Sequence, residues 1–322
     1  MHYVLTTLVF AAYLAVAAVY SLALQWFRRR LRARFQNRLG PKYTGPAGLL
    51  QPFADFLKLL SKEDIELRHC DNTAIAAMLV VSSALAVLNL FFLPLLGRPL
   101  ISFEGDLILV VVLSSTASAL ASVAAWLTES HYSRVGAARL LFQLLAIDLP
   151  LLVLALTPAT LTGSLSIGTI SARIPGLLTT KPLMAPVWFA AFVLMLLTVV
   201  AEAEDNPFSI PHAETEVVAG YYTEFSGRKL ALVHLVHDVH YLSMAALTAA
   251  IYLGAGSWLS GFLAFPVSAV EIFAVAAAMV LISSVTSRLR MDQMLALFWK
   301  GVTPLALMTY LVSRIGAGVL IW

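Results

Sequence analysis

The sequence has few charged residues and a single cysteine, and both scarcities narrow the class of protein. Only 12% of the 322 residues are charged, against roughly 25% in a soluble domain. Hydrophobic residues make up 60% of the chain and the mean hydropathy is +0.86, so we expect much of the surface to face lipid. Cys70 alone can form neither an intrachain disulfide nor the ligand set of an iron–sulfur cluster.

Several signatures of soluble proteins are also absent. The chain has no Gly-rich phosphate loop, no nucleophile elbow and no dinucleotide fingerprint. Its net charge of +3 comes mostly from basic residues beside apolar runs, which indicates a membrane surface and no nucleic-acid partner. The first apolar run lacks a small-residue cleavage site, so we interpret it as a retained span.

Eight apolar runs predict an all-α integral membrane protein, with residues 1–322 forming one polytopic domain. Each run is close to the ~20 residues that a helix needs to cross a bilayer, and a helix satisfies its own backbone groups in lipid. The runs lie at about 3–27, 73–96, 107–128, 140–160, 182–201, 230–256, 262–287 and 301–321. Most of the 21 Lys and Arg residues fall in the odd-numbered connections. The positive-inside rule therefore predicts a multi-pass protein of the cell membrane with both termini on the outer side.

The first connection, residues 28–72, is predicted to be a cytoplasmic docking loop. Gly40-Pro41 and Gly45-Pro46 mark turns. Apolar residues then recur at helical spacing from Leu49 to Leu60, which predicts an amphipathic helix along the membrane interface. The basic run from Arg28 to Arg32 is typical of a segment that stops translocation and binds anionic lipid. Because the turns indicate an ordered loop, we expect a docking or cavity role for Gln36, Arg38, Asp55 and Lys58.

Acidic residues follow the fifth apolar run directly, in the connection 202–229. Carboxylates beside hydrocarbon are costly, so a cluster of them indicates function more often than packing. The six carboxylates are Glu202, Glu204, Asp205, Glu214, Glu216 and Glu224. We interpret them as part of a site that handles protons or other ions at one membrane face.

Ionisable residues also lie inside the predicted spans. Asp148 in the fourth run is expected to be partly desolvated and able to exchange protons, with a helix–helix hydrogen bond as the structural alternative. Gln143 is expected to share its cavity. Glu271 and Arg314 either pair with each other or take part in ion transfer.

The sixth run contains the sequence L-V-H-L-V-H-D-V-H-Y. His234, His237 and Asp238 share one helix face by their i, i+3, i+4 spacing, and His240 points elsewhere. We rank a proton relay first and a structural pair second. A metal site ranks third, because the segment lacks the H-E-x-x-H pattern of helical zinc sites.

Three segments resemble one family. They are F-Q-N-R-L-G-P-K-Y-T-G-P-A-G-L-L-Q-P-F-A-D-F-L-K-L-L-S-K-E-D at 35–64, the stretch from A-E to T-E-F-S-G at 201–227, and R-M-D-Q-M-L-A-L-F-W-K at 290–300. The chain is similar to subunit 1, also called the H subunit, of respiratory complex I (NADH-quinone oxidoreductase). The family includes the related membrane subunit of energy-converting membrane-bound hydrogenases. The likeness spans most of the chain, and the family also has eight helices.

The resemblance implies a heel subunit of a redox-driven ion pump, an enzyme only as part of a multisubunit oxidoreductase and translocase. Such a subunit anchors the hydrophilic electron-transfer arm and couples redox chemistry to proton or sodium translocation through buried carboxylates. Expected partners are hydrophilic iron–sulfur and hydrogenase-like subunits on the cytoplasmic face, with antiporter-like and small membrane subunits beside it. The chain itself would bind no cofactor, and the iron–sulfur clusters would lie in the partners. Its cytoplasmic side would help to form the cavity where quinone is reduced, or the equivalent space in the hydrogenases.

The residue patterns and the resemblance together assign the candidate sites. The ion-translocation set is Asp148, Glu202, Glu214, Glu216, Glu224, His237 and Asp238. The cavity and docking set is Gln36, Arg38, Asp55, Lys58, Lys62, Glu63, Asp64, Phe208, Arg290 and Asp292. No catalytic residue and no metal ligand is expected in this chain.

Four positions depart from the family pattern. Arg28 stands where the family has an acid, Ser209 and His212 stand where it has Asp and Glu, and His237 replaces a glutamate. These changes favour a relative that passes electrons to protons or to an acceptor other than quinone. One alternative is the quinone-binding subunit of a NADH- or ferredoxin-quinone oxidoreductase. Another is a stand-alone secondary transporter, which the intramembrane charges fit but the missing internal repeat does not.

Overall fold

The computed structural model describes residues 2–68, 70–259 and 263–319, without the side chains of 2–6, 178–179, 214–215 and 317–319. Within these residues all regular structure is helical, and eight helices are long and apolar enough to cross a membrane. The expected all-α membrane fold with eight spans is therefore confirmed. The candidate spans are Thr7–Phe35, Asn72–Leu90, Asp106–Trp126, His131–Thr162, Pro182–Glu202, Gly227–Leu253, Ala264–Val285 and Met291–Gly316.

The spans consist of long α-helices, three of them with shorter segments attached. The long helices are α1 (His2–Phe35), α3 (Asn72–Leu90), α4 (Asp106–Trp126), α5 (His131–Thr162), α7 (Ala185–Glu202), α9 (Gly227–Thr248), α10 (Ala264–Val285) and α12 (Thr303–Val319). The attached segments are η2 (Pro182–Met184) before α7, η4 (Ala249–Leu253) after α9, and α11 (Met291–Leu297) with η6 (Phe298–Val302) before α12. The connections contain η1 (Pro46–Gly48), α2 (Gln51–Ser61), α6 (Ile167–Thr180), α8 (Glu214–Val217) and η3 (Gly220–Tyr222).

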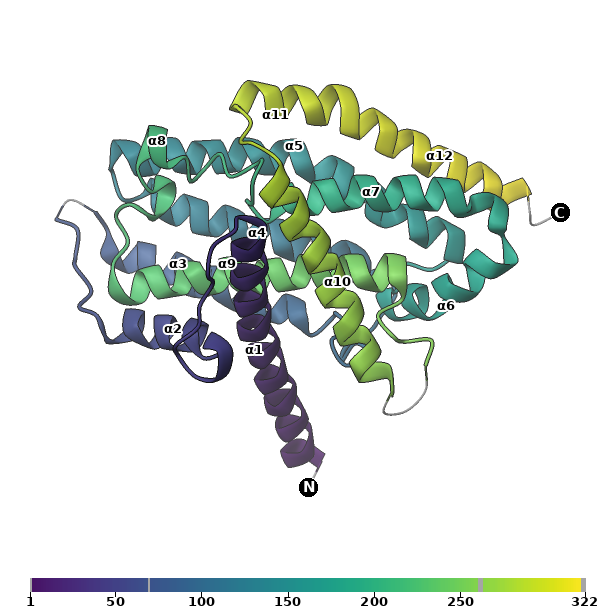
Figure 1. Ribbon diagram of the computed structural model, residues 1–322, viewed down its shortest axis with the longest axis horizontal. Helices are drawn as coiled ribbons and strands as arrows, with labels where there is room; N and C mark the ends of the chain where they lie inside the picture. The colour runs from purple at the N-terminus through teal and green to yellow at the C-terminus, as the bar shows by residue number, and fades with distance from the viewer. Residues whose placement is uncertain (1, 69, 260–262, 320–322) are drawn as a thin grey trace.

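Helix α9 forms the centre of the bundle. It packs against α1, α2, α3, α4, α7 and α10 and is the most buried of the eight candidate spans. Alanines at its C-terminal end, including Ala245 and Ala246, have no exposed surface and allow neighbouring helices to approach closely. Helices α1 and α10 cross obliquely in front of helices that run along the long axis (Figure 1). The residues of α9 therefore reach both the α1 side and the α7 side of the molecule.

Helix α1 is longer than the sequence analysis predicted. We expected the first span to end near Phe27 and a loop to begin at residue 28, but the helix continues to Phe35. Arg and Leu are good helix formers, so the basic run extends the helix. It ends before Asn37, which has the left-handed φ of 53°. The arginines of this run are consequently held on a rigid helix.

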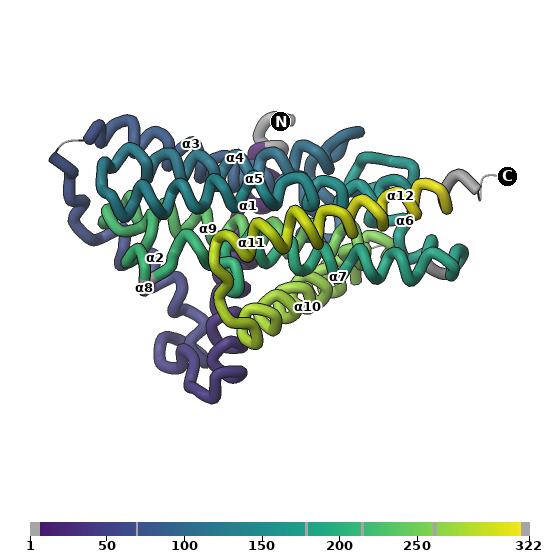
Figure 2. The backbone as a smooth tube through the Cα atoms, turned by 90° about the horizontal axis from the view of Figure 1, so that it is seen from above, coloured from purple at the N-terminus to yellow at the C-terminus, as the bar shows by residue number. Residues whose placement is uncertain are grey.

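The predicted amphipathic helix is present as α2. It packs against α1 and α9, while the end of α1 and the turns that lead into α2 project from the rest of the bundle (Figure 2). Leu50 just before it, with Phe53, Leu57 and Leu60 within it, remains exposed. An exposed apolar face on a short helix beside the spans is typical of a helix at a membrane interface.

Helix α6 was not predicted. Its 14 residues include Gly168, Pro175 and Gly176, and the sequence analysis treated the segment as part of a connection. The helix is formed because it packs against α5 and η4, with the Ser171 hydroxyl donating to the Gly254 carbonyl over 2.9 Å. Tertiary contacts stabilise a segment too short to span the bilayer by itself.

The connection 203–226 lies tightly against α5. A Cβ atom on Gly136 would lie 2.5 Å from the backbone nitrogen of Tyr221. Gly220 has φ of +61°, and a Cβ there would lie 1.8 Å from the Pro211 carbonyl oxygen. Only glycine fits such contacts without displacing the backbone. These two glycines therefore bring Tyr221 and its neighbour Tyr222 into the interior.

Candidate functional site

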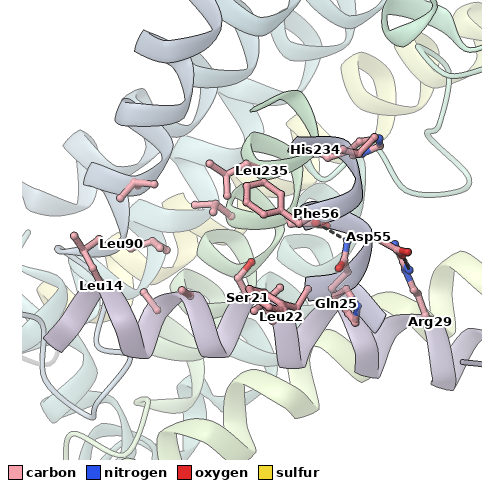
Figure 3. A pocket seen from close by; sticks show the side chains of 18 of the residues that line it. Leu14, Ser21, Leu22, Gln25, Arg29, Asp55, Phe56, Leu90, His234 and Leu235 are labelled. Atoms are coloured by element: carbon pink, nitrogen blue, oxygen red, sulfur yellow. Dashed lines mark hydrogen bonds and ion pairs between the residues drawn. The ribbon is translucent and has the colours of Figure 1, made fainter. Parts of the chain in front are cut away.

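A cavity of about 590 Å³ lies between α1, α2 and α9. Figure 3 shows side chains of α1 and α2 and of the α9 segment at His234 and Leu235 turned towards it. Most of its wall is apolar, with Leu14, Leu22, Phe56 and Leu90 among the lining residues. Its polar end is lined by Gln25, Arg29, Asp55, Lys58, His234 and Asp238. The cavity thus has the shape and polarity for a ligand with an apolar body and a polar head.

An ion pair holds α2 against α1 at the polar end. The Arg29 Nη1 lies 2.5 Å from the Asp55 Oδ2, and the Gln51 side chain donates to the other Asp55 oxygen over 2.8 Å. Burial raises the pKa of Asp55, but these hydrogen bonds outweigh that effect and hold it below its ordinary value. Asp55 and Lys58 thus line the cavity, and their docking or cavity role stays a prediction.

Arg28 is buried and paired with carboxylates, whereas the sequence analysis interpreted the basic run as a lipid-binding segment. Its Nη2 lies 3.3 Å from the Asp205 Oδ1 and its Nη1 lies 3.7 Å from the Asp238 Oδ1. The guanidinium also stacks over the Tyr241 ring, 3.6 Å from its centroid. Arg32 adds a second cation, 3.0 Å from Asp205. This pairing could not be predicted from the basic run, because both carboxylates come from segments far away in the sequence.

Asp238 belongs to both the cavity and the Arg28 cluster. It lines the cavity and accepts a hydrogen bond of 2.5 Å from the Gln25 amide. The His237 Nδ1 lies 3.8 Å from its Oδ1, so the expected His237/Asp238 pair is brought together. His234, one turn earlier, lines the cavity as well.

Glu204 is buried and surrounded by hydrogen-bonding side chains. The His212 Nε2 lies 2.6 Å from its Oε2, and the Tyr221 hydroxyl donates to the same oxygen over 3.2 Å. Burial alone would raise the pKa of Glu204, but His212 lowers it below the ordinary carboxyl value. For the adjacent Asp205, burial is likewise outweighed by Arg28 and Arg32, which hold its pKa low. Two consecutive carboxylates are thus kept ionised within the protein.

Glu202 ends helix α7 and is almost completely buried. His240, which the helix spacing places off the face of His234, His237 and Asp238, has its Nε2 3.5 Å from the Glu202 Oε1. The Gln143 amide donates to the Ala201 carbonyl over 2.7 Å, whereas Asp148 accepts from the Ser115 hydroxyl over 2.6 Å. Gln143 and Asp148 thus have different partners, although Asp148 and Glu202 are close enough to interact electrostatically.

The remaining acids of the connection are less buried. Glu216 is exposed, and its carboxylate lies 2.5 Å from the Arg139 Nη1. Both residues line a second cavity of about 240 Å³ with Arg288, Arg290 and Asp292. Glu224 is half-buried and close enough to Cys70 to interact with it electrostatically. The side chain of Glu214 lies outside the described residues.

The other docking candidates differ in exposure and in their partners. Gln36 and Arg38 are exposed beyond the end of α1, away from the cavity lining. Lys62 and Glu63 are exposed after α2, and Asp64 lies 3.8 Å from Lys229. Phe208 is fully buried, with its ring 5.4 Å from that of Phe298. Phe208 is therefore a core residue that holds the connection in place.

The expected pair of Glu271 and Arg314 does not form. Arg314 is exposed, while Glu271 accepts hydrogen bonds from the backbone at Ala255 and Gly256 and from the Trp258 side chain. Among the described residues, no group of three or more His, Cys, Asp or Glu side chains is arranged to hold a metal ion.

Sequence reasoning missed Gln25, Arg29, Tyr221 and Tyr222. The two tyrosines lie in a connection whose polar sequence gave no sign of burial. The available signal was Gly220, because a glycine directly before two aromatic residues indicates a close backbone approach.

Comparisons with known proteins agree with this architecture. Residues 7–314 match the family model for NADH dehydrogenase. The chain is 35% identical to the H subunit of NADH-quinone oxidoreductase from Thermomicrobium roseum, over 92% of each chain. It is 32% identical to an H subunit of the same enzyme from Geobacter metallireducens, over 97% of this chain and 95% of that protein.

A solved structure shows the same fold. One chain in the membrane-bound sulfane sulfur reductase, an archaeal respiratory membrane complex, matches with a TM-score of 0.81 and 24% identity. The match covers 93% of this chain and 96% of that one. The resemblance seen in the sequence is confirmed: the chain belongs to the NADH dehydrogenase family of membrane proteins, together with the H subunits of NADH-quinone oxidoreductases.

Proposed function

We propose that the chain is the heel subunit of a complex I-like, redox-driven ion pump. In this role it anchors a hydrophilic electron-transfer arm and couples redox chemistry to proton or sodium translocation. The observation that carries the proposal is the position of Asp238, which lines the cavity and pairs through Arg28 with Asp205 in the acidic connection. A change of charge in the cavity is therefore felt by buried carboxylates outside it.

The distances make this coupling strong. Two unit charges about 4 Å apart interact by about 4 kcal/mol at an effective dielectric constant of 20. Arg28 lies within 3.7 Å of both Asp238 and Asp205, so neutralising either acid changes the field at the other. An electron or proton delivered at the polar end of the cavity would thus change the proton affinity of Asp238 first and of the connection next.

Glu202 and Asp148 continue the line away from the cavity. Glu202 interacts electrostatically with both Glu204 and Asp148. Asp148 is only half-buried, and its neighbours Leu145 and Leu149 on α5 are exposed. A carboxylate on an apolar helix surface is costly in lipid. We therefore assign this face of α5 to a neighbouring antiporter-like or small membrane subunit that receives the ion.

The docking face is assigned to the side that carries α2 and the 203–226 connection. The second cavity there is lined by Arg139, Arg288 and Arg290 and by two acids. Charged, partly exposed residues of both signs suit a polar protein interface. With this face in the cytoplasm, both termini lie outside, as the positive-inside rule predicts.

Ion pumping by the intact complex tests the proposal. Glu202→Gln and Asp148→Asn should each abolish translocation per electron, because each removes a proton-binding carboxylate. Glu129→Gln is the matched control, since Glu129 is exposed and its ion pair with Arg134 is long, at 3.9 Å. Unchanged pumping in both test variants would refute the carboxylate line. Iron–sulfur subunits should co-purify with the chain, and a chain that purifies alone would favour the secondary transporter.

Quinone reduction at the cavity is the second candidate. The apolar lining and polar end that suit an amphiphilic ligand favour it. A photoreactive quinone should then label α1 or α2 in the purified complex, and unlabelled quinone should compete. If labelling is absent while electron transfer continues, the acceptor is not a quinone bound in this cavity.

A further inference from the structure

The buried connection between α7 and α9 contains two tyrosines for which the ion-coupling scheme above has no role. The Tyr221 hydroxyl donates to Glu204, 3.2 Å from its Oε2. The Tyr221 and Tyr222 hydroxyl oxygens are 3.3 Å apart. The Tyr222 ring lies between His212, with centroids 4.3 Å apart, and the cavity-lining His234, with centroids 5.3 Å apart. The pair thus spans the distance from the cavity wall to a buried carboxylate.

We propose that Tyr221 and Tyr222 carry protons between the polar end of the cavity and Glu204. This inference rests on the proposed function, because it names the route by which the cavity exchanges protons with the buried acids. It concerns hydroxyl groups, whereas the function above was argued from carboxylates.

The Arg28 cluster cannot provide this route. Arg28 stands between Asp238 and Asp205, and a guanidinium does not release its proton in a protein. Arg28 therefore transmits charge but blocks proton transfer. His237 contacts Asp238 at 3.8 Å, and among the described side chains it makes no hydrogen bond to Glu204. The tyrosine pair is the hydrogen-bonded connection that reaches Glu204 from the cavity side.

The transfer balances without ionising a tyrosine. A protonated His234 gives its proton, across one water molecule, to the Tyr222 oxygen. Tyr222 passes its own hydroxyl proton to the Tyr221 oxygen, and Tyr221 passes its proton to a Glu204 oxygen. His234 becomes neutral, Glu204 becomes a neutral carboxyl, and each hydroxyl ends with one proton. The water is needed because the rings of His234 and Tyr222 contact each other without a described hydrogen bond.

Two further features fit such a relay. Burial and the nearby Glu204 carboxylate raise the pKa of both tyrosines well above the ordinary value, so both hydroxyls keep their protons and act only as carriers. Glu204 is ionised and accepts from Tyr221. The Tyr221 hydroxyl lies within donating distance of both the Tyr222 oxygen, at 3.3 Å, and the Glu204 Oε2, at 3.2 Å. Its single proton can therefore turn from Tyr222 to Glu204, which frees the Tyr221 oxygen to accept from Tyr222.

The test is redox-driven proton translocation in vesicles that contain the whole complex. Tyr222→Phe and Tyr221→Phe remove one hydroxyl each and keep the rings that pack against His212. Tyr252→Phe is the matched control, because Tyr252 is also an interior tyrosine but donates to a backbone carbonyl, that of Leu154, over 2.9 Å. A positioned proton carrier contributes about 100-fold or more to the transfer step itself. Because other steps share control of the overall rate, we expect the proton translocation rate per assembled complex to fall at least tenfold in both test variants. The rate should stay unchanged in the control.

The outcomes separate this inference from the proposed function. If Glu202→Gln stops pumping while both tyrosine variants pump like Tyr252→Phe, the tyrosine relay is wrong and the carboxylate scheme stands. If Glu202→Gln and Asp148→Asn pump normally, the proposed function itself fails. Rates are normalised to assembled complex, measured by co-purification, so that a variant with a folding defect is not counted as a loss of transfer. Should one variant fail to assemble, the other decides: normal pumping overturns the relay.

Discussion

Replacing Arg28 by glutamine should destabilise the chain by about 3 kcal/mol. Removing one partner of a buried ion pair costs about 3–5 kcal/mol, because the other charge is left uncompensated. Arg28 is 9% exposed and has two carboxylate partners. Asp205 retains Arg32 at 3.0 Å and Asp238 retains Gln25 at 2.5 Å, so we expect the lower end of that range.

The neighbouring Arg29→Gln is the matched control. Its ion pair with Asp55 joins side chains that are 42% and 33% exposed, and exposed pairs contribute about 1 kcal/mol or less. Heating detergent-solubilised membranes and detecting the soluble chain by an epitope tag gives a midpoint for each variant. At about 2 °C per kcal/mol, Arg28→Gln should lower the midpoint by on the order of 5 °C, and Arg29→Gln by much less. Equal small shifts would refute the buried charge cluster.

The pH dependence of the Arg28→Gln effect gives a second check. In the wild-type chain the pKa of Asp205 lies below its usual value of 3.8, so its stabilising contribution is present above that pH and is lost as the pH falls further. In the variant, Asp205 can be protonated at higher pH, which removes the uncompensated charge. The difference in midpoint between variant and wild type should therefore shrink as the pH falls from 7 towards 4. A difference that grows instead would contradict the assignment.

Two other predictions concern Gly136 and His212. Gly136→Ala should lower the thermal midpoint and the yield of complex, at about 1–3 kcal/mol for overpacking, because its Cβ would lie 2.5 Å from the Tyr221 nitrogen. Gly176→Ala is the control, with nothing within 4 Å of the added atom, and equal effects would contradict the close approach. His212→Gln should raise the pKa of Glu204, since His212 holds it low. The acid limb of the pH profile for pumping should then move to higher pH, whereas an unchanged or lower limb would mean that Glu204 does not control the rate.

Much of the fold could be predicted from the sequence because membrane spans are read from local composition. All eight apolar runs correspond to helices. The turn residues at 40–46 are followed by α2, which begins at Gln51. Boundaries were less accurate. Helix α5 begins at His131, nine residues before the apolar run, because polar residues continue a helix outside the hydrocarbon core. Helix α6 depends on packing against η4, which no local pattern reveals.

The candidate site was predictable where its geometry is local. The His237/Asp238 pair follows from helix spacing, and Asp55 follows from the amphipathic pattern of α2. Arg28 was misinterpreted because its partner Asp205 is 177 residues away in the sequence, and a local window sees only neighbouring arginines. Tyr221 and Tyr222 were missed for a related reason. Their burial depends on Gly136 in a different helix.

The buried basic side chains of the site are each paired with a carboxylate. Arg28 faces Asp205 and Asp238, and the His212 Nε2 lies 2.6 Å from Glu204. A lone buried charge would cost several kcal/mol, so these pairings stabilise the charged interior of the site.

Glu204 and Asp205 divide the proposed coupling between two physical mechanisms. Asp205 faces arginines, which hold a fixed charge, so it can only sense a change of potential in the cavity. Glu204 faces a histidine and a tyrosine, both of which can pass protons. Adjacent residues thus receive the electrostatic signal and the proton by separate routes. Removing the Arg28 charge should then alter how electron transfer controls pumping, whereas removing the Tyr222 hydroxyl should slow the proton itself.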